Sequence, residues 1–105
     1  MNSLLLQRVA ATVAIHRWAT SHDDRCAWLV ECLTRHSRHD WGDLDEADAA
    51  ANAAAIDMRR GRVVSAYRVP TSLATVDTPD DHVWIITDEI GDASSPVTIL
   101  WPSDY

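Results

Sequence analysis

The stretch RVVSAYRV, residues 62–69, decides the fold class of this chain of 105 residues. Its side chains alternate between the two faces of an extended strand, with Val63, Ser65, Tyr67 and Val69 on one face and Val64, Ala66 and Arg68 on the other. All four prolines and two of the three glycines of the chain lie from Gly61 onward. Because Gly and Pro interrupt helices, we expect helices before Gly61 and strands after it.

Two further strands follow the first. HVWIITD, residues 82–88, is almost wholly apolar, which favours a central strand covered at least partly on both faces. VTILWP ends at Pro102, which cannot donate to a strand ladder. Short connections favour a meander. We therefore predict one α+β domain, residues 1–105, in which two or three N-terminal helices pack on one face of a C-terminal antiparallel sheet of three or four strands.

Three segments before Gly61 have apolar residues at helical spacing. The first, residues 4–20, fits a short strand, LLLQRVA, followed by a helix. The second is a helix over Asp23–Ser37 with Ser21 as its N-cap, and the third is a helix over residues 44–59 that Gly61 ends in a left-handed conformation. The predicted buried residues are Cys26, Leu29, Val30 and Leu33 in the second helix and Leu44, Ala47, Ala51, Ala54 and Met58 in the third.

The stretch HDWGDLDEAD, residues 39–48, holds five carboxylates, so it either binds a metal ion or begins the third helix. An EF-hand loop fails because the glycine and the final glutamate that it requires are absent. With Asp43 at the N-cap and Glu46 three residues later, the stretch instead fits a capping box. Asp45 and Asp48 then lie in the first turns, where the helix dipole is positive. We therefore expect Asp43 to cap the helix.

Cys32 and His36 lie one helical turn apart, with His39 nearby, and these three are the weak candidates for metal ligands. A zinc site uses a closed set of four ligands, so a buried thiol beside surface histidines is the simpler interpretation. Cys26 is too far from Cys32 on the same helix for a disulfide, and both thiols are expected to be reduced and buried. A small metal-assisted hydrolase that uses His36, His39 and Asp40 stays an alternative function.

Motifs for other chemistry are absent from the sequence. It has no Gly-x-Ser-x-Gly elbow and no glycine-rich phosphate loop. We therefore assign no catalytic residue, expect no cofactor and predict a protein that is not an enzyme. No apolar run is long enough for a signal-peptide core or a membrane span, so a cytoplasmic protein without membrane contact is expected.

The formal charge is −7, from sixteen acidic residues and nine basic ones. Such a surface repels nucleic-acid phosphates, so direct binding of nucleic acid is disfavoured. It suits a partner protein with a basic surface, although the acids can also serve solubility alone in a generic interaction domain. A homodimer stays open. The predicted binding residues are Trp41, an aromatic side chain of the kind that anchors interfaces, and the acids Asp40, Asp43, Asp45, Glu46, Asp48, Asp80 and Asp81.

Four motifs in order, CLTRHSRHDWGDLDEADAAANAAAI, RVVSAYRV, HVWIITD and TILWPSDY, resemble a family of small uncharacterised bacterial proteins of plasmids, phages and other mobile elements. The family signature falls on Arg35, His36, Asp40, Trp41, Gly42, Asp43, Leu44, Asn52, Ser65, Ala66, Tyr67, Trp84, Ile85, Ile86, Thr87, Thr98, Ile99, Leu100, Pro102 and Tyr105. Trp101 stands where the family has Leu, and the loop over residues 70–81 is long.

The resemblance implies a setting and, by analogy, a function. Members often carry a restriction-modification label, but this chain has no methyltransferase motif. Small acidic proteins of mobile elements often block host defence nucleases by occupying nucleic-acid grooves. The resemblance and the charge together predict a small acidic, non-enzymatic binding protein, an anti-defence inhibitor of the anti-restriction or anti-CRISPR type. Its partner would be a host defence nuclease or surveillance complex, whose basic nucleic-acid-binding surface it would block.

Overall fold

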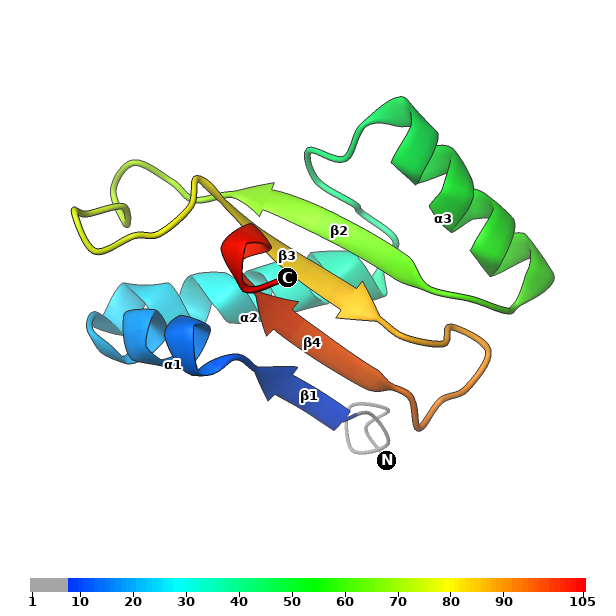
Figure 1. Ribbon diagram of the computed structural model, residues 1–105, viewed down its shortest axis with the longest axis horizontal. Coiled ribbons are helices and arrows are strands. Elements are labelled where there is room, and N and C mark those ends of the chain that lie inside the picture. Colours follow the sequence, from blue (N-terminus) through cyan, green and yellow to red (C-terminus); the bar gives the residue numbers. More distant parts are fainter. Residues whose placement is uncertain (1–7) are drawn as a thin grey trace.

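Figure 1 shows the computed structural model, which describes residues 8–105. The helices are α1 (Val13–Thr20), α2 (Asp23–Ser37), α3 (Glu46–Met58) and the short 3-10 helix η2 (Pro102–Asp104), and the strands are β1 (Arg8–Ala11), β2 (Val63–Arg68), β3 (His82–Thr87) and β4 (Pro96–Leu100). The predicted order of a strand and then a helix at the start of the chain is confirmed. The first residues of the predicted strand LLLQRVA lie outside the described residues.

One sheet contains all four strands, in the order β1-β4-β3-β2. Strands β2, β3 and β4 form the predicted antiparallel meander, and β3 is central. The prediction of a wholly antiparallel sheet is wrong at β1, which pairs in parallel with β4. A parallel pair needs a long crossover between its strands, and α1, α2, α3, β2 and β3 all lie between these two. The fold is α+β with a mixed sheet.

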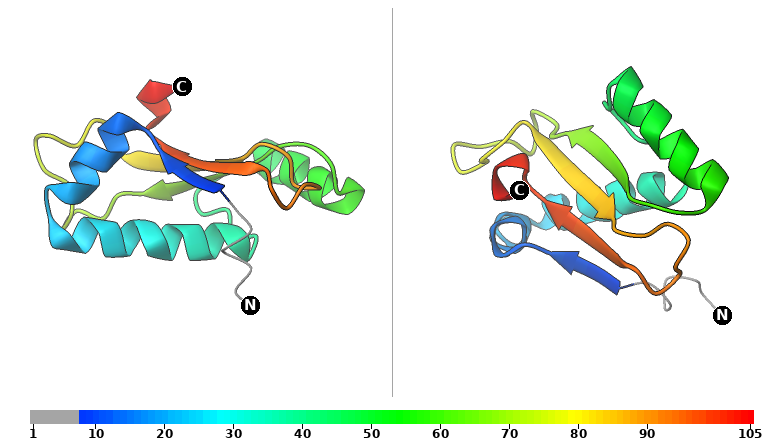
Figure 2. Two further views of the ribbon diagram at one scale, coloured as in Figure 1. Left: turned by 90° about the horizontal axis from the view of Figure 1, so that it is seen from below. Right: turned by 45° about the vertical axis from the view of Figure 1, so that its right-hand side comes forward.

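The helices are divided between a face and an edge of the sheet. The left view of Figure 2 shows α1 and α2 on one face, η2 on the opposite face, and α3 beside the sheet. We call the face under α1 and α2 the inner face. It carries the buried side chains of Val63, Ser65, Tyr67, Val83 and Ile85. The outer face carries the alternate residues, which include Val64, Ala66, Trp84 and Ile86.

Helix α2 has the predicted bounds but a different buried face. Its buried residues are Arg25, Leu29, Cys32 and His36, whereas Cys26 is exposed and the side chain of Val30 is 61% exposed. The predicted N-cap is also wrong, because the Ser21 hydroxyl donates to the Arg17 carbonyl and no side chain caps the helix. The buried face of α2 therefore includes the polar residues Arg25 and His36 and differs from the apolar stripe that the sequence predicts.

Helix α3 contacts the edge strand β2 through a narrow line of residues. Asn52 and Ala55 are its buried residues. The prediction for this face is wrong, because Ala47, Ala51, Ala54 and Met58 are exposed and Leu44 precedes the helix. A helix beside an edge buries less of its surface than one lying on a sheet. Its C-cap is Arg59, with a φ of 52°, and the prediction of Gly61 is also wrong.

The stretch over residues 39–48 and Asn52 of α3 together close the open edge of β2. The Asn52 side chain accepts from the Val64 amide at 3.1 Å and donates to the Val64 carbonyl at 2.7 Å. Two residues further along β2, the Ala66 amide donates to the Trp41 carbonyl at 3.0 Å, and the Asp43 amide donates to the Ala66 carbonyl at 2.8 Å. These four bonds satisfy backbone groups that an edge strand otherwise leaves unpaired.

This attachment explains why Asp43 does not cap α3. Gly42 has a φ of +70°, and a Cβ there would lie 2.1 Å from the Ala66 carbonyl oxygen, so only glycine allows the contact. Asp43 follows directly and is held to β2 by its backbone. The chain therefore turns into the helix two residues later, where the Asp45 carboxylate accepts from the Asp48 amide at 2.8 Å. The predicted Asp43 cap is wrong.

None of the helices in residues 8–105 combines the length and the apolar composition that a membrane crossing requires.

Candidate binding groove on the outer sheet face

A groove of about 600 Å³ lies on the outer face of the sheet. Its floor consists of Val64 and Ala66 from β2 and Trp84 and Ile86 from β3. One wall is the segment that leads into α3 together with the first half of that helix. The other wall is the C-terminal turn, which η2 places on this face (Figure 2). The groove therefore has an apolar floor between two walls that are far apart in the sequence.

Five carboxylates line this groove: Asp43, Asp45, Asp48, Asp80 and Asp81. They come from two segments more than thirty residues apart. The strand register explains why the segments meet. Arg68, the last residue of β2, pairs with His82, the first of β3, while the 39–48 stretch is bonded to β2 at Ala66. Five of the eight predicted binding residues thus share one site.

Three of these acids are already engaged by neighbouring groups. His82 lies between two of them, with its Nδ1 2.9 Å from Asp81 and its Nε2 3.2 Å from Asp43. The hydrogen bond with His82 holds the pKa of Asp81 below its ordinary value. Asp80 accepts from the Ser103 amide at 3.1 Å and from its hydroxyl at 2.7 Å. These contacts hold the carboxylates of Asp43, Asp80 and Asp81 in place at one end of the groove.

The remaining two acids, Asp45 and Asp48, differ in how free their carboxylates are to bind a ligand. Asp45 caps α3 with one carboxylate oxygen. The Asp48 side chain makes no hydrogen bond or ion pair within residues 8–105, and it lines the groove directly. Asp48 is therefore the carboxylate most free to bind an incoming cation.

The predicted binding residues do not include the aromatic and basic side chains of the groove floor and C-terminal wall, Trp84, Tyr105 and Arg62. Trp84 forms part of the floor, and its ring packs edge-on against Tyr105, with centroids 5.8 Å apart. Arg62 places its guanidinium 5.6 Å from the centroid of the Tyr105 ring and donates to the Tyr105 hydroxyl. The alternation of His82, Trp84 and Ile86 along β3 was a signal for Trp84, because it places all three on one face.

The other three predicted binding residues lie elsewhere. Asp40 is paired with Arg35 at 2.8 Å, and this hydrogen bond lowers the pKa of Asp40. Trp41 stacks on His39 with ring centroids 5.2 Å apart and lines a second cavity of about 650 Å³. Glu46 is exposed in the first turn of α3 and does not line the groove. The predicted acidic cluster is therefore divided between separate places.

The structure does not bring the metal-ligand candidates together. The prediction of surface histidines is wrong for His36, which is buried, with Nδ1 2.6 Å from the Ser65 hydroxyl and Nε2 2.8 Å from the Thr87 hydroxyl. Burial lowers its pKa to about 4. Burial raises the pKa of Cys32 to about 12. His39 lies on the surface. Within residues 8–105, no group of three or more His, Cys, Asp or Glu side chains is placed to hold a metal ion.

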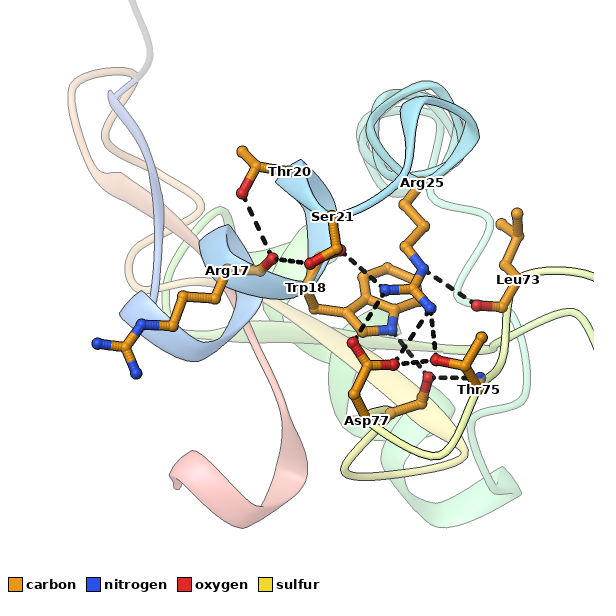
Figure 3. A network of polar contacts seen from close by, with 9 residues as sticks. Arg17, Trp18, Thr20, Ser21, Arg25, Leu73, Thr75 and Asp77 are labelled. Carbon is orange, nitrogen blue, oxygen red and sulfur yellow. Dashed lines mark hydrogen bonds and ion pairs between the residues drawn. The ribbon is translucent and has the colours of Figure 1, made fainter.

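The loop before β3 is fixed by Arg25, whose side chain is fully buried. Figure 3 shows the guanidinium among acceptors from α1 and the loop. It donates to the carbonyls of Leu73 and Trp18 at 3.1 and 3.0 Å, to the Thr75 hydroxyl at 2.8 Å, and to Asp77 at 3.4 Å. Because this loop continues to Asp80 and Asp81, Arg25 helps to position the acids of the groove from the inner side.

Comparison of the chain with protein-family models, with curated proteins and with solved structures finds no match. The resemblance to mobile-element proteins therefore stays a prediction.

Proposed function

We propose that this chain is a non-enzymatic binding protein whose groove on the outer sheet face accepts a basic part of a partner protein. One observation carries the proposal. Two acidic segments, distant in the sequence, converge on the same apolar-floored groove. Acids that served solubility alone would have no reason to gather around a concave apolar surface. A charged cleft with low-dielectric walls concentrates the electric potential and attracts ligands of opposite charge.

The two parts of the groove have different physical roles. The floor, with Trp84 half-buried, offers apolar surface whose burial stabilises a complex. The carboxylates speed the encounter and set the orientation of the partner, which is the usual contribution of charge at an interface. A complex of this kind weakens as salt rises, because exposed charges are screened within about 10 Å at 0.1 M.

The resemblance to mobile-element proteins narrows the partner that we propose. An element that enters a bacterial cell meets nucleases and surveillance complexes whose nucleic-acid-binding surfaces are rich in Lys and Arg. Carboxylates that stand in for phosphates would compete for such a surface. We therefore propose an anti-defence inhibitor that acts in the cytoplasm, makes no direct contact with nucleic acid and requires no cofactor.

A capture experiment with matched charge reversals tests the proposal. Immobilised protein is incubated with bacterial lysate at low and high salt, and the Asp48→Lys and Glu46→Lys variants are compared. Both residues lie in the first turn of α3, so the two changes are matched in charge and in their effect on the helix dipole. Only Asp48 lines the groove. We expect a partner that is captured at low salt, lost at high salt, lost with Asp48→Lys and retained with Glu46→Lys.

Two outcomes contradict the proposal. One is capture of the same partner regardless of salt and of both reversals, which leaves a generic interaction domain. The other is equal loss with both variants while their thermal melting curves match that of the unmodified protein, since a groove-specific partner must distinguish Asp48 from Glu46.

A further inference from the structure

We propose that the occupant of the groove is an extended, arginine-bearing segment of the partner protein, whose guanidinium groups lie between the carboxylates of the walls and the aromatic rings of Trp84 and Tyr105. This inference rests on the proposed function, because it names the chemistry of the partner. It differs in geometry from the capping of a flat basic surface, since the partner must insert a segment into a groove.

The shape of the groove requires a narrow occupant. The floor follows β3 from His82 to Ile86, a length of about 13 Å at the rise of a strand. That length matches about four residues of extended chain. The occupant lies on the face and does not add a strand at the neighbouring edge, because Asn52 and the 39–48 stretch already occupy the hydrogen-bonding groups of Val64 and Ala66.

The charge of the groove requires a cationic occupant. Five carboxylates line it, while Arg62 is the single Lys or Arg side chain among the lining residues, all of which are described. His82 is shared by Asp43 and Asp81, and Asp48 makes no polar contact within the described part of the chain. Five carboxylates beside one arginine over an apolar floor favour a ligand that brings both positive charge and apolar surface.

The aromatic rings favour a guanidinium over an ammonium group. Arg62 already shows how a guanidinium is held at this site, because it lies over the Tyr105 ring and donates to the Tyr105 hydroxyl. Tyr105 is 68% exposed, so its ring has free surface. A guanidinium is planar, stacks on aromatic rings and pairs with carboxylates through two parallel donors, whereas a lysine ammonium is a compact, strongly hydrated charge.

Synthetic peptides test this inference directly. The probe is a peptide of about six residues in which arginine alternates with valine, a length that covers the floor with one residue to spare at each end. Matched peptides replace every arginine by lysine or by glutamate. Calorimetry at low salt should show one bound arginine peptide per chain, an affinity about tenfold lower for the lysine peptide, and no heat with the glutamate peptide.

Variants of the protein locate the bound peptide. Asp48→Asn should weaken the arginine peptide several-fold, and Glu46→Gln, which removes the same charge from the same turn outside the groove, should leave its affinity unchanged. Trp84→Val keeps a strand-forming residue in β3 and should reduce the preference for arginine over lysine. Thermal melting of each variant separates lost binding from lost fold.

Either of two results would overturn the inference. They are equal affinity for the arginine and lysine peptides, and an equal response to Asp48→Asn and Glu46→Gln. Failure here is distinguishable from failure of the proposed function. If no peptide binds, yet a captured partner is still lost with Asp48→Lys and kept with Glu46→Lys, the groove binds a basic surface in another form. If neither experiment shows dependence on Asp48, both proposals fail.

Discussion

The two faces of one sheet are built in opposite ways. The inner face is sealed by α1 and α2, and five of its side chains from β2 and β3 are at most 1% exposed. The outer face is covered only at its margins, by the start of α3 and by the C-terminal turn, and a groove remains between them (Figure 2). The inner face is thus sealed, while on the outer face Ala66 and Ile86 are buried beneath the groove and Val64 and Trp84 stay partly exposed.

Neighbouring residues therefore have opposite roles along the same strand. Ile85 is completely buried in the core, and Trp84 and Ile86 on either side of it form the floor of the groove. The same holds for Ser65 and Ala66 in β2. Because side chains alternate with a period of two, a shift of one residue in register would exchange the core with the binding surface.

The removal of Arg25, which lies on the inner side of the sheet, should lower the free energy of unfolding most. Arg25→Met takes away every donor of a buried guanidinium and leaves the carbonyls of Trp18 and Leu73 without it, at an expected cost of about 4 kcal/mol of unfolding free energy. Urea denaturation measures this. Arg17→Met is the control, because Arg17 is exposed and its side chain extends away from the network in Figure 3. A loss below about 1 kcal/mol for Arg25→Met would show that loop packing, rather than Arg25, fixes the loop.

Lowering the pH should reduce the free energy of unfolding through His36, which is buried against the inner face. The pKa of His36 is about 4 in the folded protein, below its ordinary value of 6.5, because the ring is buried. The unfolded chain therefore takes up a proton first. The stabilisation is fully present above pH 6.5 and is lost as the pH falls toward 4, by about 3 kcal/mol in total.

Unfolding free energies measured in urea between pH 7 and pH 4 test this. His36→Gln should be less stable at pH 7, yet its stability should change much less over the same interval. An unchanged pH dependence in that variant would assign the effect to other groups. The carboxylates with lowered pKa values, such as Asp40 and Asp81, stabilise the folded protein above their ordinary pKa of 3.8, and most of that stabilisation is lost only as the pH falls below 3.8.

Asn52 lies at the edge of β2, between the two faces of the sheet. Its removal should lower the free energy of unfolding by an intermediate amount. Asn52→Ala leaves both backbone groups of Val64 without their partner, which should cost about 2 kcal/mol. Asn52→Asp keeps the acceptor for the Val64 amide but turns a carboxylate oxygen toward the Val64 carbonyl oxygen in a buried position, so it should be at least as harmful at neutral pH. A variant Asn52→Ala as stable as the unmodified protein would mean that water replaces the side chain at no cost.

The smallest expected difference lies at the margin of the outer face, between two aspartates. Asp45→Ala removes the N-cap of α3 and should cost about 1 kcal/mol. Asp43→Ala should cost less, because Asp43 holds β2 through its backbone and its carboxylate contacts His82 at the surface. Melting curves of the two variants decide the order. The reverse order would restore Asp43 as the more important residue.

The sequence predicts the strands well because their information is local. Alternation in β2 and the apolar run of β3 identify the buried faces without knowledge of any partner. The buried face of α2 could not be predicted in the same way. Arg25 in an amphipathic helix normally points to water, and its burial depends on acceptors at Leu73, Thr75 and Asp77, about fifty positions away.

The groove was predictable in its parts and not in its assembly. Both acidic segments stand out in the sequence, and five of the eight predicted residues line the groove. What joins them is the pairing of β2 with β3 and the bond between the 39–48 stretch and Ala66. The predicted cap of α3 is wrong for the same reason. Local capping rules do not include the hydrogen bond between the Asp43 amide and the edge strand β2, which moves the cap to Asp45.

The parallel pairing of β1 with β4 also determines when the sheet can be completed during synthesis. Among the strands in residues 8–105, β1 is synthesised before the others and β4 after them. The Thr12 hydroxyl, just after β1, donates to Asp104, 92 positions further along the chain. Pairing over such a separation is slow, because closing a long loop costs conformational entropy before any contact between the two strands forms. Strand β1 has no neighbour among the described strands until β4 has been made, whereas β2, β3 and β4 pair through short connections, so β1 is expected to join the finished meander last.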